Sequence, residues 1–82
     1  MGYDVHITRR VNWWAEEGQD ISRAEWEAVV AADSGLVMTP LWWTAGRIVS
    51  KNPSDAVIVT MCQVAKVLDA RVQGDDGEYY DA

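Results

Sequence analysis

The sequence predicts a single α+β domain, residues 1–82, with the ferredoxin-like split βαβ order of strand, helix, strand, strand, helix and strand. Short segments that alternate apolar and polar residues indicate strands. Two longer segments with helical periodicity begin with capping residues, and turn residues separate all of these elements. In this arrangement two helices cover one face of an antiparallel sheet, and we expect the other face to lie open.

The first strand and the first helix carry clear signals. Tyr3 to Thr8 alternates apolar and polar side chains, as expected of a half-buried strand. The following segment to Asp20 has no period and is predicted to be a loop. Ser22 and Glu25 then form a capping box, which predicts a helix over residues 23–32.

Two strands and a second helix are expected next. The segments Leu41–Thr44 and Arg47–Lys51 have strand character, and Gly46 suits a tight hairpin between them. Asn52 as N-cap and Pro53 as first helical residue predict a helix of about sixteen residues, with its apolar stripe on one side.

The apolar stripe of this second helix includes the single cysteine of the chain but not two of its valines. Val59 and Val67 lie off the stripe and are expected on the surface, whereas Cys62 is expected to be buried. After the helix, Ala70–Gly74 is predicted to be a strand. An Asp76-Gly77 turn then precedes a possible short terminal strand.

Composition limits the classes of partner. Thirteen acidic and seven basic residues give a net charge of −6, without the Lys/Arg footprint that binds phosphate backbones. We therefore expect neither nucleic acid nor membrane as partner, whereas a basic protein partner is compatible. No stretch approaches the ~20 apolar residues of a membrane span. A single cysteine fits a reducing cytoplasm, and no cofactor motif is present.

Three aromatic doublets are the most informative feature of the chain: Trp13-Trp14, Trp42-Trp43 and Tyr79-Tyr80. In an extended segment, neighbouring side chains point to opposite faces, so each doublet sends one ring each way. A small domain has one core, so some rings need another cover. In a first alternative, the Trp13-Trp14 loop folds back over the open sheet face. In a second, two copies of the chain associate, either through their open sheet faces or through the helix surfaces near Val59 and Val67. In a third, the rings line a ligand groove.

The polar residues give weaker signals. His6 is the single histidine, with Asp4 two residues earlier on the same face, but no nucleophile can be placed beside it. The acidic turn of Asp75, Asp76 and Glu78, with Asp81, matches no calcium-loop spacing. The Glu16-Glu17 pair is typical of a solvated loop. We therefore predict no catalytic residue and no metal ligand.

Several stretches together resemble a family of small uncharacterised bacterial proteins of unknown function. These are the opening Tyr3-Asp4-Val5-His6-Ile7-Thr8-Arg9, the Trp13-Trp14 doublet with Glu16-Glu17-Gly18, Ile21-Ser22 with Glu25-Trp26, Ile48-Val49 with Lys51-Asn52-Pro53, and Val72-Gln73-Gly74-Asp75-Asp76-Gly77-Glu78-Tyr79. The segment between the first helix and Trp42 is shorter here than in that family. The resemblance implies a bacterial, cytoplasmic protein of a type that also occurs on mobile gene cassettes, and it implies no activity.

The sequence as a whole favours a small non-enzymatic protein-interaction domain that forms a homodimer through an aromatic-rich surface. The residues expected on this surface are His6, Trp14, Trp42 and Trp43. On this hypothesis, Trp43→Ala weakens association more than folding. The alternative is a small-ligand-binding protein, or an enzyme, that uses a Trp-lined groove with His6 and Asp4.

Overall fold

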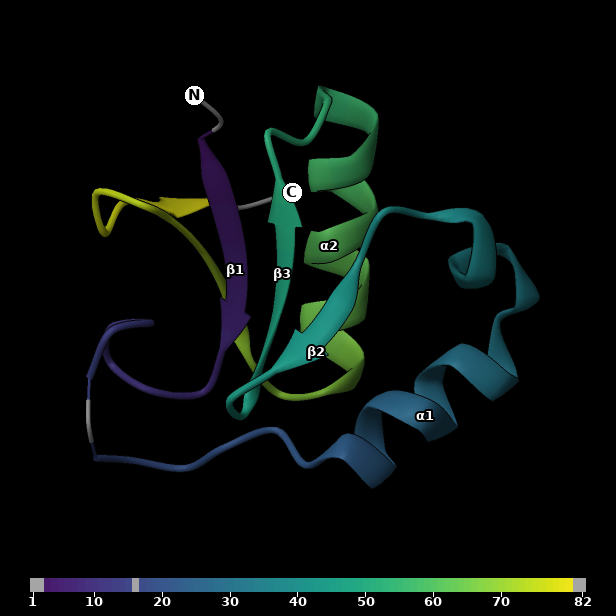
Figure 1. Ribbon diagram of the computed structural model, residues 1–82, viewed down its shortest axis with the longest axis horizontal. Helices are drawn as coiled ribbons and strands as arrows, with labels where there is room; N and C mark the ends of the chain where they lie inside the picture. Colours follow the sequence, from purple (N-terminus) through teal and green to yellow (C-terminus); the bar gives the residue numbers. More distant parts are fainter. Residues whose placement is uncertain (1–2, 16, 81–82) are drawn as a thin grey trace.

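A computed structural model describes residues 3–15 and 17–80. Glu16 of the Glu16-Glu17 pair and Asp81 of the acidic turn therefore lie outside the described residues. The elements, in chain order, are β1 (Asp4–Thr8), α1 (Arg23–Ala32), the 3₁₀ helix η1 (Ser34–Met38), β2 (Trp42–Thr44), β3 (Arg47–Lys51), α2 (Asp55–Val67), β4 (Arg71–Gly74) and β5 (Tyr79–Tyr80) (Figure 1).

The five strands form one antiparallel sheet in the order β2-β3-β1-β4-β5. The predicted α+β class is therefore confirmed. The ferredoxin-like strand order as a whole is not confirmed, because a fifth strand beside β4 makes the order of this sheet different. The additional strand arises at Gly77, whose φ of +91° lets the chain turn back so that Tyr79 and Tyr80 pair with β4.

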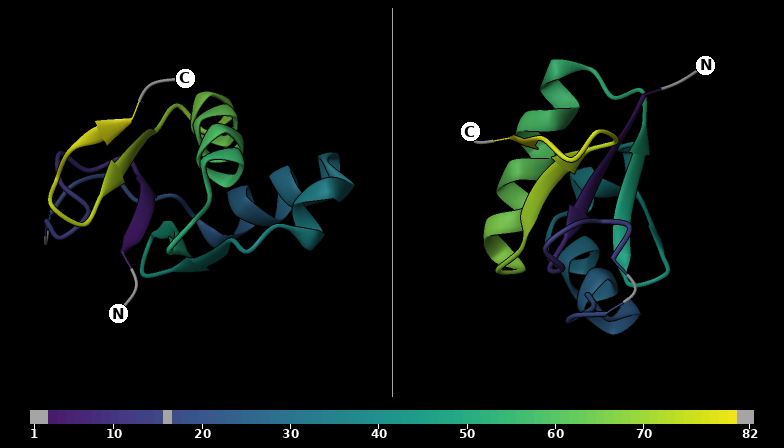
Figure 2. Two further views of the ribbon diagram at one scale, coloured as in Figure 1. Left: turned by 90° about the horizontal axis from the view of Figure 1, so that it is seen from above. Right: turned by 90° about the vertical axis from the view of Figure 1, so that its left-hand side faces the viewer.

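One face of the sheet carries the core. Ile7 pairs with Ile48 on one side and with Val72 on the other, so these side chains share a face. Helix α2 lies along this face, whereas α1 lies farther from the sheet and extends away from it (Figure 2). Both helices contribute to the same core, α2 with Met61 and α1 with Trp26.

The helices largely follow the sequence prediction. The capping box of Ser22 and Glu25 is present, and α1 spans the predicted residues. In α2, Cys62 is buried and Val59 and Val67 are exposed, as predicted. Within the described part of the chain, no helix is long and apolar enough to cross a membrane.

The start of α2 was predicted wrongly. Asn52 adopts a left-handed conformation with φ of +46°, and its N–H donates to the carbonyl of Tyr3 at 2.9 Å. The residue therefore ends β3 rather than capping the helix. Ser54 is the N-cap, and its hydroxyl accepts the N–H of Val57.

Candidate functional site

The histidine of β1 lies on the sheet face opposite α2, and it is not open to solvent. The His6 side chain is 3% exposed, and its Nε2 lies 2.9 Å from Oδ1 of Asp75. The second carboxylate oxygen of Asp75 accepts the backbone N–H of Asp4 at 2.9 Å. The hydrogen-bond partner of His6 is thus Asp75, directly after β4, whereas Asp4 from the same strand contributes only its backbone N–H to Asp75.

Trp13 covers His6. The two rings are stacked with centroids 4.2 Å apart and planes 8° from parallel. The loop after β1 passes on the side of the sheet away from α2 (Figures 1 and 2). Of the alternatives for the aromatic doublets, the structure thus has the loop folded back over the sheet, with Trp13 covering His6. The guanidinium of Arg47 lies over the Trp13 ring, 5.4 Å from its centroid.

Gln73 fixes the covering loop and was missed by sequence reasoning. The side chain is fully buried. Its oxygen accepts the N–H of Trp13 at 2.7 Å, and its amide nitrogen donates to Asn12 and to the carbonyl of Gly77. One amide therefore joins the loop after β1 to the β4–β5 turn. Alternation along β4 would have placed Gln73 on the same face as His6, but not beneath a covering loop.

The surroundings of His6 favour its neutral form. Burial lowers the pKa of His6, the hydrogen bond to Asp75 opposes this, and the charge of Arg47 lowers it further. Burial raises the pKa of Asp75, but the hydrogen bonds from His6 and from the N–H of Asp4 outweigh burial, so that this pKa is lower than usual. A general base must reach the proton that it abstracts. A histidine covered by an indole is suited to anchoring the loop and not to that reaction.

The second ring of this doublet remains on the surface. Trp14 packs edge-on against Trp13, with centroids 5.5 Å apart, and is 51% exposed. Nearby, the hydroxyl of Tyr79 donates to the carbonyl of Val11 at 2.6 Å, and both of these residues are exposed as well. The loop and β5 therefore present a partly apolar surface.

The Trp42-Trp43 doublet sends one ring to each side of the sheet, as predicted. Trp42 pairs with Val49, which pairs with His6, so Trp42 shares the face of His6; it is 39% exposed. Trp43 pairs with Ile48 on the helix face and packs against the core.

A groove lies between α1 and the edge strand β2, and we call it the aromatic groove. Its volume is about 430 Å³. The lining residues are three tryptophans, a leucine and an ion pair: Trp26, Trp42, Trp43, Leu41, Arg23 and Glu27. Within the ion pair, Arg23 Nε lies 3.3 Å from Glu27 Oε1. Neither His6 nor Asp4 is among the lining residues.

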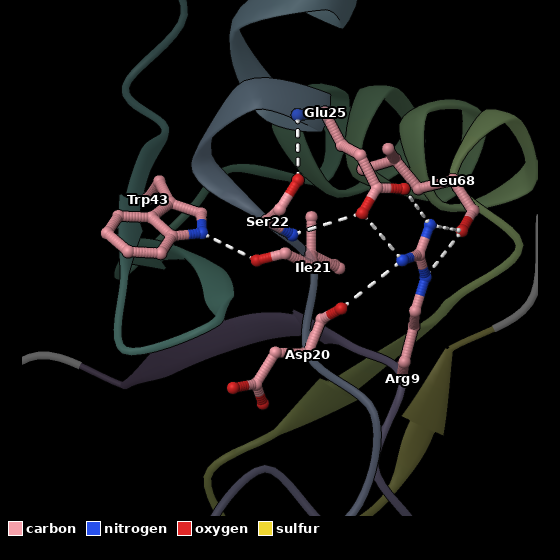
Figure 3. Close-up of polar contacts among 7 residues, drawn as sticks. All are labelled: Arg9, Asp20, Ile21, Ser22, Glu25, Trp43 and Leu68. Atoms are coloured by element: carbon pink, nitrogen blue, oxygen red, sulfur yellow. Dashed lines mark hydrogen bonds and ion pairs between the residues drawn. The ribbon is translucent and has the colours of Figure 1, made fainter.

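A network of hydrogen bonds holds the walls of this groove in place (Figure 3). The indole N–H of Trp43 donates to the carbonyl of Ile21 at 2.8 Å. Just beyond Ile21, the capping box begins α1, and its Glu25 accepts two hydrogen bonds from Arg9 at 2.9 and 2.5 Å. Arg9 also donates to the carbonyl of Leu68 from both Nε and Nη2, at 2.9 and 2.6 Å. The arginine thus ties the start of α1 to the end of α2.

The ion pair between Arg9 and Glu25, at the centre of this network, shifts the pKa values of both side chains. The hydrogen bonds from Arg9 lower the pKa of Glu25 to about 2, with help from the backbone N–H of Ser22. The hydrogen bond to Glu25 raises the pKa of Arg9. The pair is therefore charged at neutral pH.

The predicted surface residues thus occupy two places. His6 and Trp14 both contact Trp13, whereas Trp42 and Trp43 line the aromatic groove. In the acidic turn, Asp75 binds His6 and Glu78 accepts the hydroxyl of Tyr3. Residues 3–15 and 17–80 contain no group of three His, Cys, Asp or Glu side chains that could hold a metal ion.

Comparison of the chain with protein-family models, with curated proteins and with solved structures gave no match.

Proposed function

We propose that this protein is a non-enzymatic interaction domain that forms a homodimer through the aromatic groove. The observation that carries the proposal is the position of Trp42. Trp42 is 39% exposed and lines a groove whose other walls include Trp26 and Trp43. Tryptophan is enriched at the centres of protein interfaces, where it supplies a large share of the binding free energy.

The charges around the groove support pairing of two identical copies. A chain with a net charge of −6 repels its own copy, so a homodimer needs a contact region with little net charge. The charged residues of the groove, Arg23 and Glu27, have opposite signs and pair with each other. The groove is therefore a region with aromatic walls and little net charge on an acidic protein.

A basic protein partner is the second occupant compatible with the overall charge. Such a partner would be attracted over long distances by the acidic surface and would bind more weakly at high salt. A homodimer centred on tryptophan would not weaken at high salt, because salt screens the repulsion between two acidic copies. The resemblance to small bacterial proteins stays a prediction and adds no activity to either case.

Sedimentation velocity on the wild type and on Trp42→Ser tests the proposal. We expect the wild type to dimerise at micromolar to millimolar concentration, and Trp42→Ser to weaken association by about tenfold or more. Val67→Ser is the matched control, because Val67 is 73% exposed on α2 and does not line the groove. A wild type that stays monomeric at millimolar concentration, or a Val67→Ser variant that loses association equally, would refute the proposal.

The same groove supports a second candidate function, the binding of a small planar ligand. A volume of about 430 Å³ lies within the range of ligand pockets, which are roughly 300–1,000 Å³. Titration of small aromatic metabolites against tryptophan fluorescence would test it. A saturable change that Trp42→Ser abolishes, in a protein that remains monomeric, would favour this function over dimerisation.

We also infer that strands β1 to β4 keep the ferredoxin-like arrangement and that β5 was added beside it. The support is that β1 lies between β3 and β4, and that β2 lies beyond β3. A variant that ends after Gly74 would test this inference. It should keep the amide-exchange protection of the β1–β3 pairing if β5 is an addition, and lose it if the five strands form one indivisible unit.

A further inference from the structure

His6 has two ring nitrogens, and the fold provides a partner for one of them. The carboxylate of Asp75 only accepts hydrogen bonds, so Nε2 of His6 carries the proton and donates across 2.9 Å. The other nitrogen, Nδ1, is buried and has no hydrogen-bond partner among residues 3–15 and 17–80. Protonation of the imidazole would place a second N–H donor at Nδ1. Because a buried donor without an acceptor costs free energy, the covered site disfavours the protonated ring.

The covering loop, residues 9–15, shields His6 from water. The ring of Trp13 stacks on the imidazole, and the His6 side chain is only 3% exposed. Trp13 is held by two hydrogen bonds: its backbone N–H donates to Gln73, and its indole N–H donates to the carbonyl of Asp75 at 3.3 Å. The loop belongs to no helix or strand. A surface loop that is held by individual hydrogen bonds, and not by strand pairing, can open while the sheet stays intact.

Charged groups act on His6 from three elements. Asp75, directly after β4, favours the protonated ring, and so does Asp4 of β1, whereas the guanidinium of Arg47 from β3 opposes it. Burial is the largest influence, and it lowers the pKa of His6. Arg47 lies over the ring of Trp13, so this cation belongs to the closed arrangement. When Trp13 leaves, water reaches the imidazole and the penalty of burial is removed.

The remaining charged residues of the covering loop and of this sheet face lie against other partners. Arg9 and Arg10 form ion pairs with acidic side chains farther along the chain. Arg71 of β4 lies over the ring of Tyr79, and Lys51 is exposed at the end of β3. The balance at the histidine is therefore set by its burial and by the three charged groups that face it.

From this geometry we propose that His6 is a proton-sensitive switch for the covering loop. The neutral ring holds the loop closed, and uptake of one proton favours an open state in which water hydrates the N–H at Nδ1. Because protonation and opening favour each other, acid raises the equilibrium constant for opening by about tenfold per pH unit at most. Acidification thereby exposes Trp13 beside the already exposed Trp14. Neither His6 nor Trp13 lines the aromatic groove, so the switch does not depend on the proposed dimer.

Amide hydrogen exchange, measured by NMR between about pH 7.5 and pH 5, tests the switch. The protection factor compares the exchange rate of an amide with its rate in an unfolded chain at the same pH. We expect the protection factor of the Trp13 amide to fall by about fivefold or more across this range, mostly below pH 6.5, the ordinary pKa of histidine. Asp75 stays ionised throughout, because its pKa lies below its ordinary value of 3.8.

The control is the amide of Thr39, which donates to the carbonyl of Leu36 in η1 at 3.1 Å. Opening of η1 does not uncover the histidine, so the protection factor of Thr39 should change by less than about twofold. A constant protection factor at Trp13 would overturn the proposal. An equal fall at Thr39 would also overturn it, because it would show that acid loosens the whole domain.

His6→Phe is the matched variant, because phenylalanine keeps an aromatic ring beneath Trp13 but takes up no proton. Asp75 then loses its histidine donor, but it keeps the N–H of Asp4, and its side chain is 32% exposed to water. The protection factor of the Trp13 amide should change by less than about twofold over the same pH range in this variant. A fall as large as that of the wild type would overturn the proposal. Circular dichroism shows whether the fold is intact.

Imidazole NMR of the wild type provides a test that needs no variant. The fall in protection of the Trp13 amide must lie between pH 6.5, the ordinary pKa of histidine, and the pKa that His6 shows in the folded protein. A fall outside this interval would belong to another titrating group, and the role of His6 as the switch would be refuted.

Discussion

Replacing Arg9 with methionine should remove much of the stability of this domain. The methionine keeps an unbranched apolar stem but loses every hydrogen bond of the guanidinium. These bonds reach the carbonyl of Leu68, the carbonyl of Asp20 and both oxygens of Glu25. Arginine at this position therefore connects three segments that are distant in the sequence.

The magnitude follows from what each partner can do without the arginine. Leu68 is buried, so its carbonyl loses a donor that water replaces poorly, at a cost of about 1–3 kcal/mol. Glu25 is partly exposed and keeps the N–H of Ser22, so loss of the ion pair itself adds little to this cost. We expect a total loss of about 1–3 kcal/mol, which for a domain of this size lowers the melting temperature by roughly 4–24 °C.

Thermal and urea unfolding followed by circular dichroism measure this loss. The matched control is Arg23→Met, since Arg23 also pairs with a glutamate of α1, but both side chains are well exposed at 74% and 67%. That control should change stability by less than about 0.5 kcal/mol. Equal losses from Arg9→Met and Arg23→Met would refute the reasoning, because they would show that the buried carbonyl contributes nothing.

Further predictions concern titration and backbone strain. The folded pKa of Glu25 is about 2, so the stability that this carboxylate contributes is fully present above pH 4.5, its ordinary pKa. That stability is lost as the pH falls from 4.5 to about 2. Carboxyl NMR measures the pKa, and unfolding at several pH values measures the stability. The pKa of His6 should lie below 6.5 in the folded protein, so the free energy of unfolding should fall as the pH decreases through 6.5. The variant Asp75→Asn should lower the pKa of His6 further. A pKa above 6.5 in imidazole NMR would contradict this prediction. Gly46→Ala should destabilise by about 1–3 kcal/mol in urea unfolding, because φ is +83° and the new Cβ would lie 2.4 Å from Cγ of Asp20. Gly35→Ala, where φ is not in the left-handed region, should cost much less.

Local signals in the sequence predicted the elements well. The capping box of Ser22 and Glu25 lies within four residues, so its hydrogen bonds depend on no distant contact, and α1 begins where it predicts. The failure at Asn52 has a tertiary cause. The N–H of Asn52 is paired with the carbonyl of Tyr3, just before the neighbouring strand β1, and this pairing overrides its propensity to cap a helix.

The candidate sites were harder to predict, because their residues meet only in the folded sheet. His6 and Asp75 are 69 positions apart, and Trp13 and Gln73 are 60 apart. Asp4 was the obvious partner for His6 by alternation, but the register of β4 brings Asp75 closer. The Trp42-Trp43 doublet was predictable because strand alternation alone sends its rings to opposite faces.

The two outer strands of the sheet are very short, with three residues in β2 and two in β5. Few backbone amides and carbonyls are therefore free at either edge to pair with another chain, and short edge strands are a recognised defence against open-ended stacking. Assembly at the β2 side would thus be governed by indole packing, which ends once the rings are covered. An acidic protein with such edges resists growth into fibrils by strand addition.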